Sequence, residues 1–150
     1  MITKNGLTIK RHTLKLLTDK KVELYNITQK VKEFIESSSI RDGFLLITSL
    51  HTTTAVFVNE VQAALWDDIK SVLQDWVKEN KEWKHNSPEY SDCERHNAVS
   101  HLRALLVGNS SSMIVQDGQP ALGEWQNIIF AELDGPRERE IRMQLIGIES

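Results

Sequence analysis

The sequence contains little that would suit an exported or membrane-bound protein. Cys93 is the only cysteine, so no intrachain disulfide can form, and a secreted scaffold that depends on disulfides is disfavoured. No stretch approaches the roughly 20 apolar residues of a membrane-spanning helix, and residues 1–6 lack the apolar core of a signal peptide. We therefore expect a cytoplasmic protein, in which an inert thiol is the simplest interpretation of Cys93.

A large excess of charge of one sign is also absent. The chain has 18 basic and 21 acidic side chains, so its net charge is only −3, and there is no electrostatic reason to expect nucleic acid or an anionic membrane as partner. Hydrophobic residues make up 40% and charged residues 26%, as in ordinary globular proteins. A length of 150 residues suits one domain, which we expect to span residues 1–150.

Segments with strand character lie at both ends of the chain, and segments with helical spacing lie between them. That order favours an α+β fold, a single compact domain with a mixed, largely antiparallel sheet packed with about three helices. Residues 44–58 read as one long strand or as two strands joined by a bulge. The other expected strands are 7–17, 22–27, 112–115, 125–133 and 139–146. One expected helix follows Thr28, and two more span residues 59–81 and 97–107.

A polar segment with an imidazole interrupts the apolar residues of 44–58. If the segment is a strand, its period of two residues directs His51 and Thr53 to the same face. Strand propensity and a backbone hydrogen bond would explain these residues without any function. Asn59 and Glu60 follow at the expected junction between strand and helix, where both also suit helix capping.

Three more histidines lie within 17 residues of one another: His85, His96 and His101. Neutral imidazoles bind zinc and other transition metals, but this spacing matches no recognised zinc motif, and solvent-exposed histidines are the simpler alternative. His85 belongs to a polar segment, residues 80–95, and His96 follows it directly. The segment is longer than usual for a loop and therefore suggests function or partner contact.

Two further groups could recognise an anion. Gly118 and Gly123 permit unusual backbone conformations beside Trp125 and Gln126, although a plain hairpin turn would explain them equally well. Arg137 follows a tight turn and suits a phosphate or carboxylate, although a surface salt bridge is the commoner use of arginine.

The order of these motifs resembles the YjbQ-like family over nearly the whole chain, most specifically over residues 42–147. The resemblance rests on the motifs HTTTAVFVNE (51–60), LWDDI (65–69), WKH (83–85), NAVSHL (97–102), LVGNS (106–110), LGEWQ (122–126) and ELDGPR (132–137). It implies a compact α+β fold, a homotrimer, and pockets at or near subunit interfaces. It also joins His51, His85 and His101 into one site and implies secondary thiamine-phosphate synthase activity.

Three hypotheses follow for the function. In a thiamine-phosphate synthase, Arg137 and Arg139 would hold phosphates, Glu60 would hold Mg²⁺, and a histidine would assist proton transfer. In a metal-dependent hydrolase or lyase, zinc would be held by His51, His85 and His101, with Glu60 as general base. A non-catalytic protein could use the same pocket to bind a metabolite.

For the enzyme hypotheses we expect a small, phosphorylated substrate. The candidate catalytic residues are His51, Asn59, Glu60 and Arg137. The candidate substrate-binding residues are Thr53, Trp125, Gln126 and Arg139.

Overall fold

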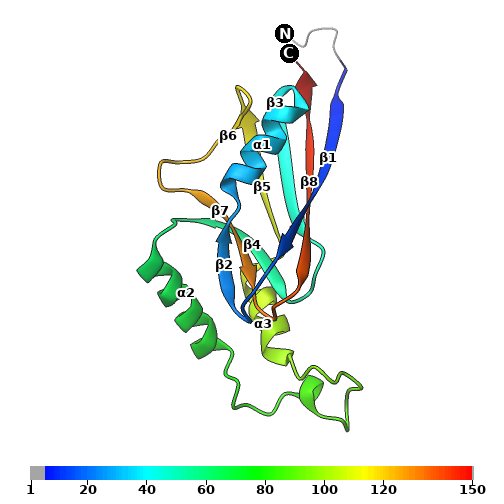
Figure 1. The fold of residues 1–150 in the computed structure, drawn as a ribbon, viewed down its shortest axis with the longest axis vertical. Coiled ribbons are helices and arrows are strands. Elements are labelled where there is room, and N and C mark those ends of the chain that lie inside the picture. The colour runs from blue at the N-terminus through cyan, green and yellow to red at the C-terminus, as the bar shows by residue number, and fades with distance from the viewer. Residues whose placement is uncertain (1–5, 150) are drawn as a thin grey trace.

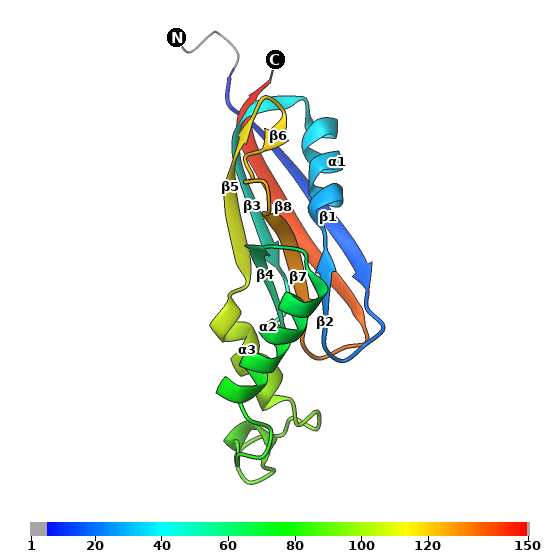
Figure 2. The same cartoon turned by 90° about the vertical axis from the view of Figure 1, so that its left-hand side faces the viewer.

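A computed structural model describes residues 6–149 and shows an α+β architecture built on two antiparallel sheets (Figures 1 and 2). Residues 1–5, which contributed to the expectation of a missing signal peptide, lie outside the described part. None of the helices within residues 6–149 is long and apolar enough to cross a membrane.

The larger sheet has five strands in the order β1-β8-β3-β5-β6, and the smaller has three in the order β2-β7-β4. The strands are β1 (Thr8–Leu17), β2 (Glu23–Asn26), β3 (Ile40–Ser49), β4 (Thr54–Asn59), β5 (Ser110–Gln116), β6 (Gln119–Pro120), β7 (Asn127–Glu132) and β8 (Glu138–Glu149). All pairings among the described residues are antiparallel, so the expected mixed sheet is instead two antiparallel sheets.

Three α-helices and one short 3₁₀ helix complete the fold, and the expected number of helices is confirmed. They are α1 (Thr28–Ser38), α2 (Ala63–Trp76), η1 (Lys84–Asn86) and α3 (Ala98–Val107). Helix α1 lies against a face of the five-stranded sheet, whereas α2, α3 and the loop that carries η1 lie at the opposite end of the molecule (Figure 2).

The smaller sheet is buried on both faces, which explains the apolar sequence of β7. Ile128 and Phe130 join the core between the two sheets and α1, and Ile129 and Ala131 join a second core with α2 and α3. A strand that is covered on both sides has no solvent face, so its apolar residues run continuously instead of alternating with polar ones.

The apolar run at residues 44–58 is not one strand. It divides into β3 and β4, which belong to different sheets and are joined by a turn at residues 50–53. His51 therefore lies in a turn, and the interpretation that placed His51 and Thr53 on one strand face was wrong. Helix α2 also begins later than expected: Gln62 rather than Asn59 caps it, by accepting a hydrogen bond from the Leu65 N–H at 2.6 Å.

Candidate functional site

Three connecting segments meet at the end of the molecule where α3 begins. They are the β3–β4 turn with His51, the loop between α2 and α3 with His85, and the β7–β8 turn with Asp134 and Arg137. With the first turns of α3 they enclose a cavity of about 420 Å³, here called the histidine–arginine pocket. It is lined by Leu50, His51, Thr52, Thr53, His85, Cys93, Arg95, Asn97, His101, Arg137 and Arg139.

The β3–β4 turn is tied to the start of β8, and this tie orients the His51 ring. The Leu50 N–H donates to the Glu140 carbonyl at 3.1 Å, and the Glu140 N–H donates to His51 Nε2 at 2.8 Å. A nitrogen that accepts a hydrogen bond carries no proton, so neutral His51 carries its proton on Nδ1. His51 thus offers an N–H donor and no free lone pair.

His85 and His101 lie beside each other although they come from different elements. Their ring centroids are 5.0 Å apart and their planes are nearly perpendicular. His85 is held by η1 and His101 by α3, and both line the histidine–arginine pocket. The pocket therefore contains all three of the histidines that the sequence motifs associate with one another.

The pKa values of His51 and His101 are both lowered from the ordinary value. Burial is the main cause for each ring, because it disfavours the charged form. The positive charge of Arg139 adds to the effect at His51, and His85 adds to it at His101. Both rings are thus biased towards the neutral imidazole, which has one nitrogen that can accept a proton and one that carries an N–H.

Two arginines face an acidic side chain at the pocket wall. Arg95 Nε lies 3.3 Å and Arg137 Nη2 lies 3.4 Å from the same Asp134 oxygen, with the arginine side chains 54% and 29% exposed. Within residues 6–149 neither guanidinium group makes another side-chain hydrogen bond, so further N–H donors are available to a phosphate.

Arg139 and Thr53 form the floor of the pocket but are already engaged. Arg139 donates to both oxygens of Glu132, at 2.7 and 2.6 Å, and to Thr53 Oγ1 at 3.0 Å. Arg139 and Glu132 are almost completely buried. As folded, Arg139 is neutralised by Glu132, so its geometry suits a structural ion pair better than the expected phosphate contact.

The structure does not bring Asn59, Glu60, Trp125 and Gln126 to this pocket within one chain. Asn59 and Asn127 pair at one end of β4 and β7, and Thr54 pairs with Glu132 at the other. Five residue steps along an antiparallel strand separate the two ends by about 17 Å. Glu60 therefore lies too far away to hold a metal ion beside the histidines of its own chain.

Those distant residues make local contacts instead. Asn59 Oδ1 accepts the Glu60 N–H at 2.8 Å, and Gln126 Oε1 accepts the Gly123 N–H at 2.8 Å. Trp125 is 67% exposed. Turn and junction geometry accounts for Asn59 and Gln126, whereas the exposure of Trp125 leaves its ring free for a contact outside this chain.

The three histidines do not fit a three-ligand zinc site in this arrangement. No group of three His, Cys, Asp or Glu side chains within residues 6–149 is placed to hold a metal ion. His51 Nε2 accepts the Glu140 N–H, and its other nitrogen carries the proton, so ligation would require breaking that hydrogen bond. Metal binding stays a prediction, which elemental analysis of the purified protein would test.

Sequence reasoning assigned no role to several residues of the pocket. Asn97, Asp134 and Arg95 line or brace it, and Cys93 is part of its wall. Asn97 and Asp134 occur in the motifs that carry the family resemblance, and their place in these motifs could have marked them as candidate site residues. Arg95 and Cys93 come from the irregular loop, where no periodicity indicates which side chains point inward.

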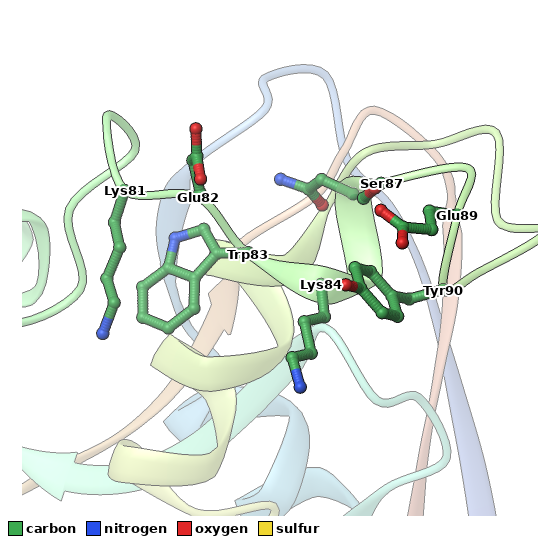
Figure 3. A pocket seen from close by; sticks show the side chains of 8 residues that line it. Lys81, Glu82, Trp83, Lys84, Ser87, Glu89 and Tyr90 are labelled. Carbon is green, nitrogen blue, oxygen red and sulfur yellow. The ribbon is translucent and has the colours of Figure 1, made fainter.

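The same loop encloses a second cavity of about 600 Å³ on its outer side (Figure 3). Lys81 lies over the Trp83 ring at 4.5 Å, and Lys84 lies over the Tyr90 ring at 5.3 Å. The Trp83 Nε1–H donates to the Lys78 carbonyl at 3.0 Å. These contacts give the long connection local support, and partner contact at this loop stays a prediction.

The two sheets and the histidine–arginine pocket define an α+β protein with a polar cavity formed by turns at one end. The chain belongs to the YjbQ family: the family described as "UPF0047 protein YjbQ-like" matches residues 12–148.

Relatives agree with this assignment over most of their length. A UPF0047 protein of Methanothermobacter thermautotrophicus is 45% identical over 134 residues, which cover 89% of this chain and 90% of the relative. The UPF0047 protein YugU of Bacillus subtilis is 33% identical over 135 residues, or 90% of this chain and 98% of the relative.

Solved structures share the fold. A YbjQ-like protein of unknown function, SSO2532 from Sulfolobus solfataricus, has a TM-score of 0.87 at 33% identity and covers 95% of this chain and 99% of its own. APE1520 from Aeropyrum pernix has a TM-score of 0.83 at 33% identity, with coverage of 92% and 98%.

Proposed function

We propose that the histidine–arginine pocket is the active site of an enzyme acting on a small phosphorylated molecule, with thiamine-phosphate synthesis as the reaction. The observation that carries this proposal is the convergence of His51, Arg95 and Arg137 in one cavity with the lowered-pKa imidazole of His101. Donors for an anion and an imidazole for proton transfer are then available in the same site.

The proposed reaction needs stabilisation of a leaving group. A carbon–nitrogen bond forms between the pyrimidinylmethyl carbon and the thiazole nitrogen, and the carbon–oxygen bond to diphosphate breaks, releasing pyrophosphate. Negative charge develops on the departing oxygen, and prearranged N–H donors stabilise such charge most effectively where water is excluded. The His51 Nδ1–H and the outer N–H groups of Arg95 and Arg137 are suited to that role.

Asp134 offers a reason why the arginines are ready before substrate binds. Its carboxylate holds both guanidinium groups at 3.3–3.4 Å, which limits their rotamers. These distances are longer than a strong charge-assisted hydrogen bond, so a phosphate can form shorter contacts with the opposite edges of the same groups. Arg137, the less exposed of the two, should contribute more.

The test is release of pyrophosphate from the two thiamine precursors by purified protein. Arg137→Ala should lower kcat/KM by roughly 100-fold, since removal of one such donor typically costs 10²–10³. Arg41→Ala is the matched control, because Arg41 pairs with Asp117 on the surface outside the pocket. Turnover no higher than that of denatured protein would reject the synthase activity.

We further propose that the protein assembles as a homotrimer in the cytoplasm. The outer face of the five-stranded sheet supports the assembly: Ile9 and Phe44 both pair with Ile146, and Phe44 also pairs with Ile114, so an apolar row crosses four strands. Phe44 and Ile114 are 50% and 62% exposed in the single chain. A contiguous apolar patch of this kind is typical of an interface.

A further inference from the structure

The Asn97 side chain links His85 to Asp134 at the wall of the histidine–arginine pocket. Its Nδ2 donates to Asp134 Oδ2 at 2.8 Å, and its Oδ1 lies 3.3 Å from His85 Nε2. Asn97 and Asp134 are only 6% and 7% exposed. Water therefore has little access to these groups, and their hydrogen bonds must be satisfied by protein partners.

The surroundings fix the orientation of the Asn97 amide. A carboxylate only accepts hydrogen bonds, and the Asp134 oxygen that meets Asn97 also faces the guanidinium groups of Arg95 and Arg137. The amide NH₂ must therefore face Asp134, which leaves Oδ1 on the side of His85. The Cys93 thiol, 3.8 Å from Oδ1, is a further donor on that side.

This orientation determines which nitrogen of His85 carries the proton. Because Asn97 Oδ1 is an acceptor, His85 Nε2 must be the donor, so neutral His85 has a free lone pair on Nδ1. His51 has the opposite tautomer, with its proton on Nδ1 and Nε2 occupied by the Glu140 N–H. The two rings thus face the same cavity in complementary states.

We infer that Asn97 and Asp134 are positioning residues that hold His85 as the proton acceptor of the pocket, opposite His51 as a fixed donor. This inference rests on the proposed function and narrows its substrate class. The pocket would select a molecule that presents an anionic acceptor to His51 and Arg137 and an N–H or O–H group to His85. In the proposed reaction that group is the exocyclic amino group of the pyrimidine. One of its protons passes to Nδ1 as the carbon–oxygen bond to diphosphate breaks and returns once the carbon–nitrogen bond has formed, so the imidazolium is transient and its Nε2–H remains bound to Asn97.

Nitrogen-15 NMR of the histidine rings at about pH 8, where unperturbed imidazoles are neutral, tests the inference without substrate. The wild-type protein should show His85 protonated on Nε2 and His51 protonated on Nδ1, with resonances assigned from His85→Gln and His51→Gln. In Asn97→Leu the His85 ring should become a mixture of tautomers, whereas the His51 ring should be unchanged and serves as the internal control.

A charge-preserving swap provides the rescue. In the double variant Asn97→Asp with Asp134→Asn, the acceptor for His85 and the hydrogen bond between positions 97 and 134 both remain possible, so the Nε2–H tautomer should return. If Asn97→Leu does not fold, the spectra of the wild-type protein and of the double variant still show whether His85 is protonated on Nε2. A wild-type His85 protonated on Nδ1, or a tautomer that survives Asn97→Leu unchanged, overturns the inference.

Kinetics separate this inference from the proposed reaction. Asn97→Leu should lower kcat for pyrophosphate release at least about twofold, because part of the His85 rings then lacks the lone pair on Nδ1, and at most about 100-fold, the lower end for general acid–base catalysis. KM should change less, and the swap should recover most of the loss in kcat. Absence of turnover in the wild-type protein would reject the synthase, while the ring spectra would still establish or refute the positioning of His85. Normal kcat in a folded Asn97→Leu protein would contradict the role of His85 as acceptor.

Discussion

Beneath the pocket, Glu132 and Arg139 form an ion pair that is closed off from solvent. Each Glu132 oxygen accepts from Arg139, and Thr18 Oγ1 donates to Glu132 Oε2 at 2.8 Å. Burial by itself raises the pKa of Glu132, but hydrogen bonds from Arg139, from the Asp134 N–H and from Thr18 outweigh it and lower the pKa. The carboxylate therefore stays ionised, and it connects β7 to the start of β8.

Removing one member of this pair should be strongly destabilising. Glu132→Ala leaves Arg139 as an uncompensated buried charge, and such changes typically cost about 3–5 kcal/mol in the free energy of unfolding. Urea denaturation followed by circular dichroism would measure it. The double variant Glu132→Leu with Arg139→Met removes both charges and should lose less. Equal losses in the single and double variants would contradict the interpretation of a satisfied pair.

The two histidines with lowered pKa couple folding to pH. Their folded pKa values lie below the unfolded value of about 6.5. As pH falls through that value the unfolded chain takes up protons that the folded chain does not, so the free energy of unfolding decreases. The contribution is complete above the unfolded pKa and is lost between the unfolded and the folded pKa values.

The free energy of unfolding should therefore begin to decline as pH falls below about 7.5 and should go on declining as pH falls through the unfolded value of about 6.5. The variant His51→Gln with His101→Gln should flatten that decline, because neither replacement titrates. Urea titrations at several pH values would measure both slopes. Parallel curves for the variant and the wild-type protein would show that burial of these imidazoles does not govern the pH dependence.

At the residue scale, sequence reasoning could associate histidines but could not assign hydrogen-bond direction. The motifs grouped His51, His85 and His101, and the structure places all three on one cavity. The tautomers depend on the Glu140 backbone and on Asn97, which lie 89 and 12 residues from their histidines. Nothing local in the sequence encodes partners at such separations.

Among the elements, β3 and β8 approach each other unusually closely at paired glycines. Gly43 and Gly147 are opposite each other next to a bulge between Ile40 and Asp42. A Cβ on Gly43 would clash with the Ile146 carbonyl oxygen, and a Cβ on Gly147 would clash with the Asp42 carbonyl oxygen. Glycine is therefore required by packing at both positions, because the backbone of the opposite strand occupies the space that a Cβ would need.

Gly43→Ala should thus destabilise the protein by about 1–3 kcal/mol, the usual cost of overpacking. Gly6→Ala is the control, because a Cβ at Gly6 meets no atom within 4 Å, and its effect should stay within about 0.5 kcal/mol. Thermal or urea denaturation of the two variants would compare them. Similar stabilities would mean that the sheet relaxes around the added methyl group.

Helices and strands with a clear hydrophobic period could be predicted from the sequence. Their boundaries could not, because these depend on contacts with other elements. Helix α1 was expected from Thr28 onwards and begins there. Residues 44–58 were expected to form one long strand or two strands joined by a bulge, and neither alternative placed them in two different sheets. Both β3 and β4 are rich in apolar residues, and what places them in different sheets is the pairing of β3 with β5 and β8 and of β4 with β7. Pairing partners are not a local property of the sequence.

Helix α2 shows a related discrepancy. Val72 and Trp76 are apolar residues of this helix and are exposed, and Leu73 is the only residue of the helix that is fully buried in the single chain. Trp66 and Ile69 pack against the second core from partly buried positions. The helix was therefore predicted correctly from its period, but its apolar face is wider than the part that the rest of this chain buries.

For the whole molecule, uncovered apolar surface on the five-stranded sheet leads to a prediction about assembly. Phe44→Glu places a charge in the middle of the exposed row and should convert a trimer of three 17.2 kDa chains into monomers. Static light scattering after size exclusion would measure the mass. Gln29→Glu on the exposed side of α1 should leave the mass unchanged.

A monomeric wild-type protein would contradict this assembly, as would a Phe44→Glu variant of unchanged mass. Should the trimer form, Trp125 and Glu60, which are distant from the pocket of their own chain, are the first residues to examine in contacts with a neighbouring chain.

The single cysteine provides a labelling site in the pocket, and its use does not require that the substrate is known. Cys93 is part of the cavity wall and is partly accessible, and the chain has no other thiol to compete for a reagent. The rate at which a maleimide alkylates this protein is consequently a direct gauge of pocket occupancy. Compounds that slow alkylation can be collected from a metabolite mixture before any reaction is known, so the physiological substrate can be sought by protection instead of by turnover.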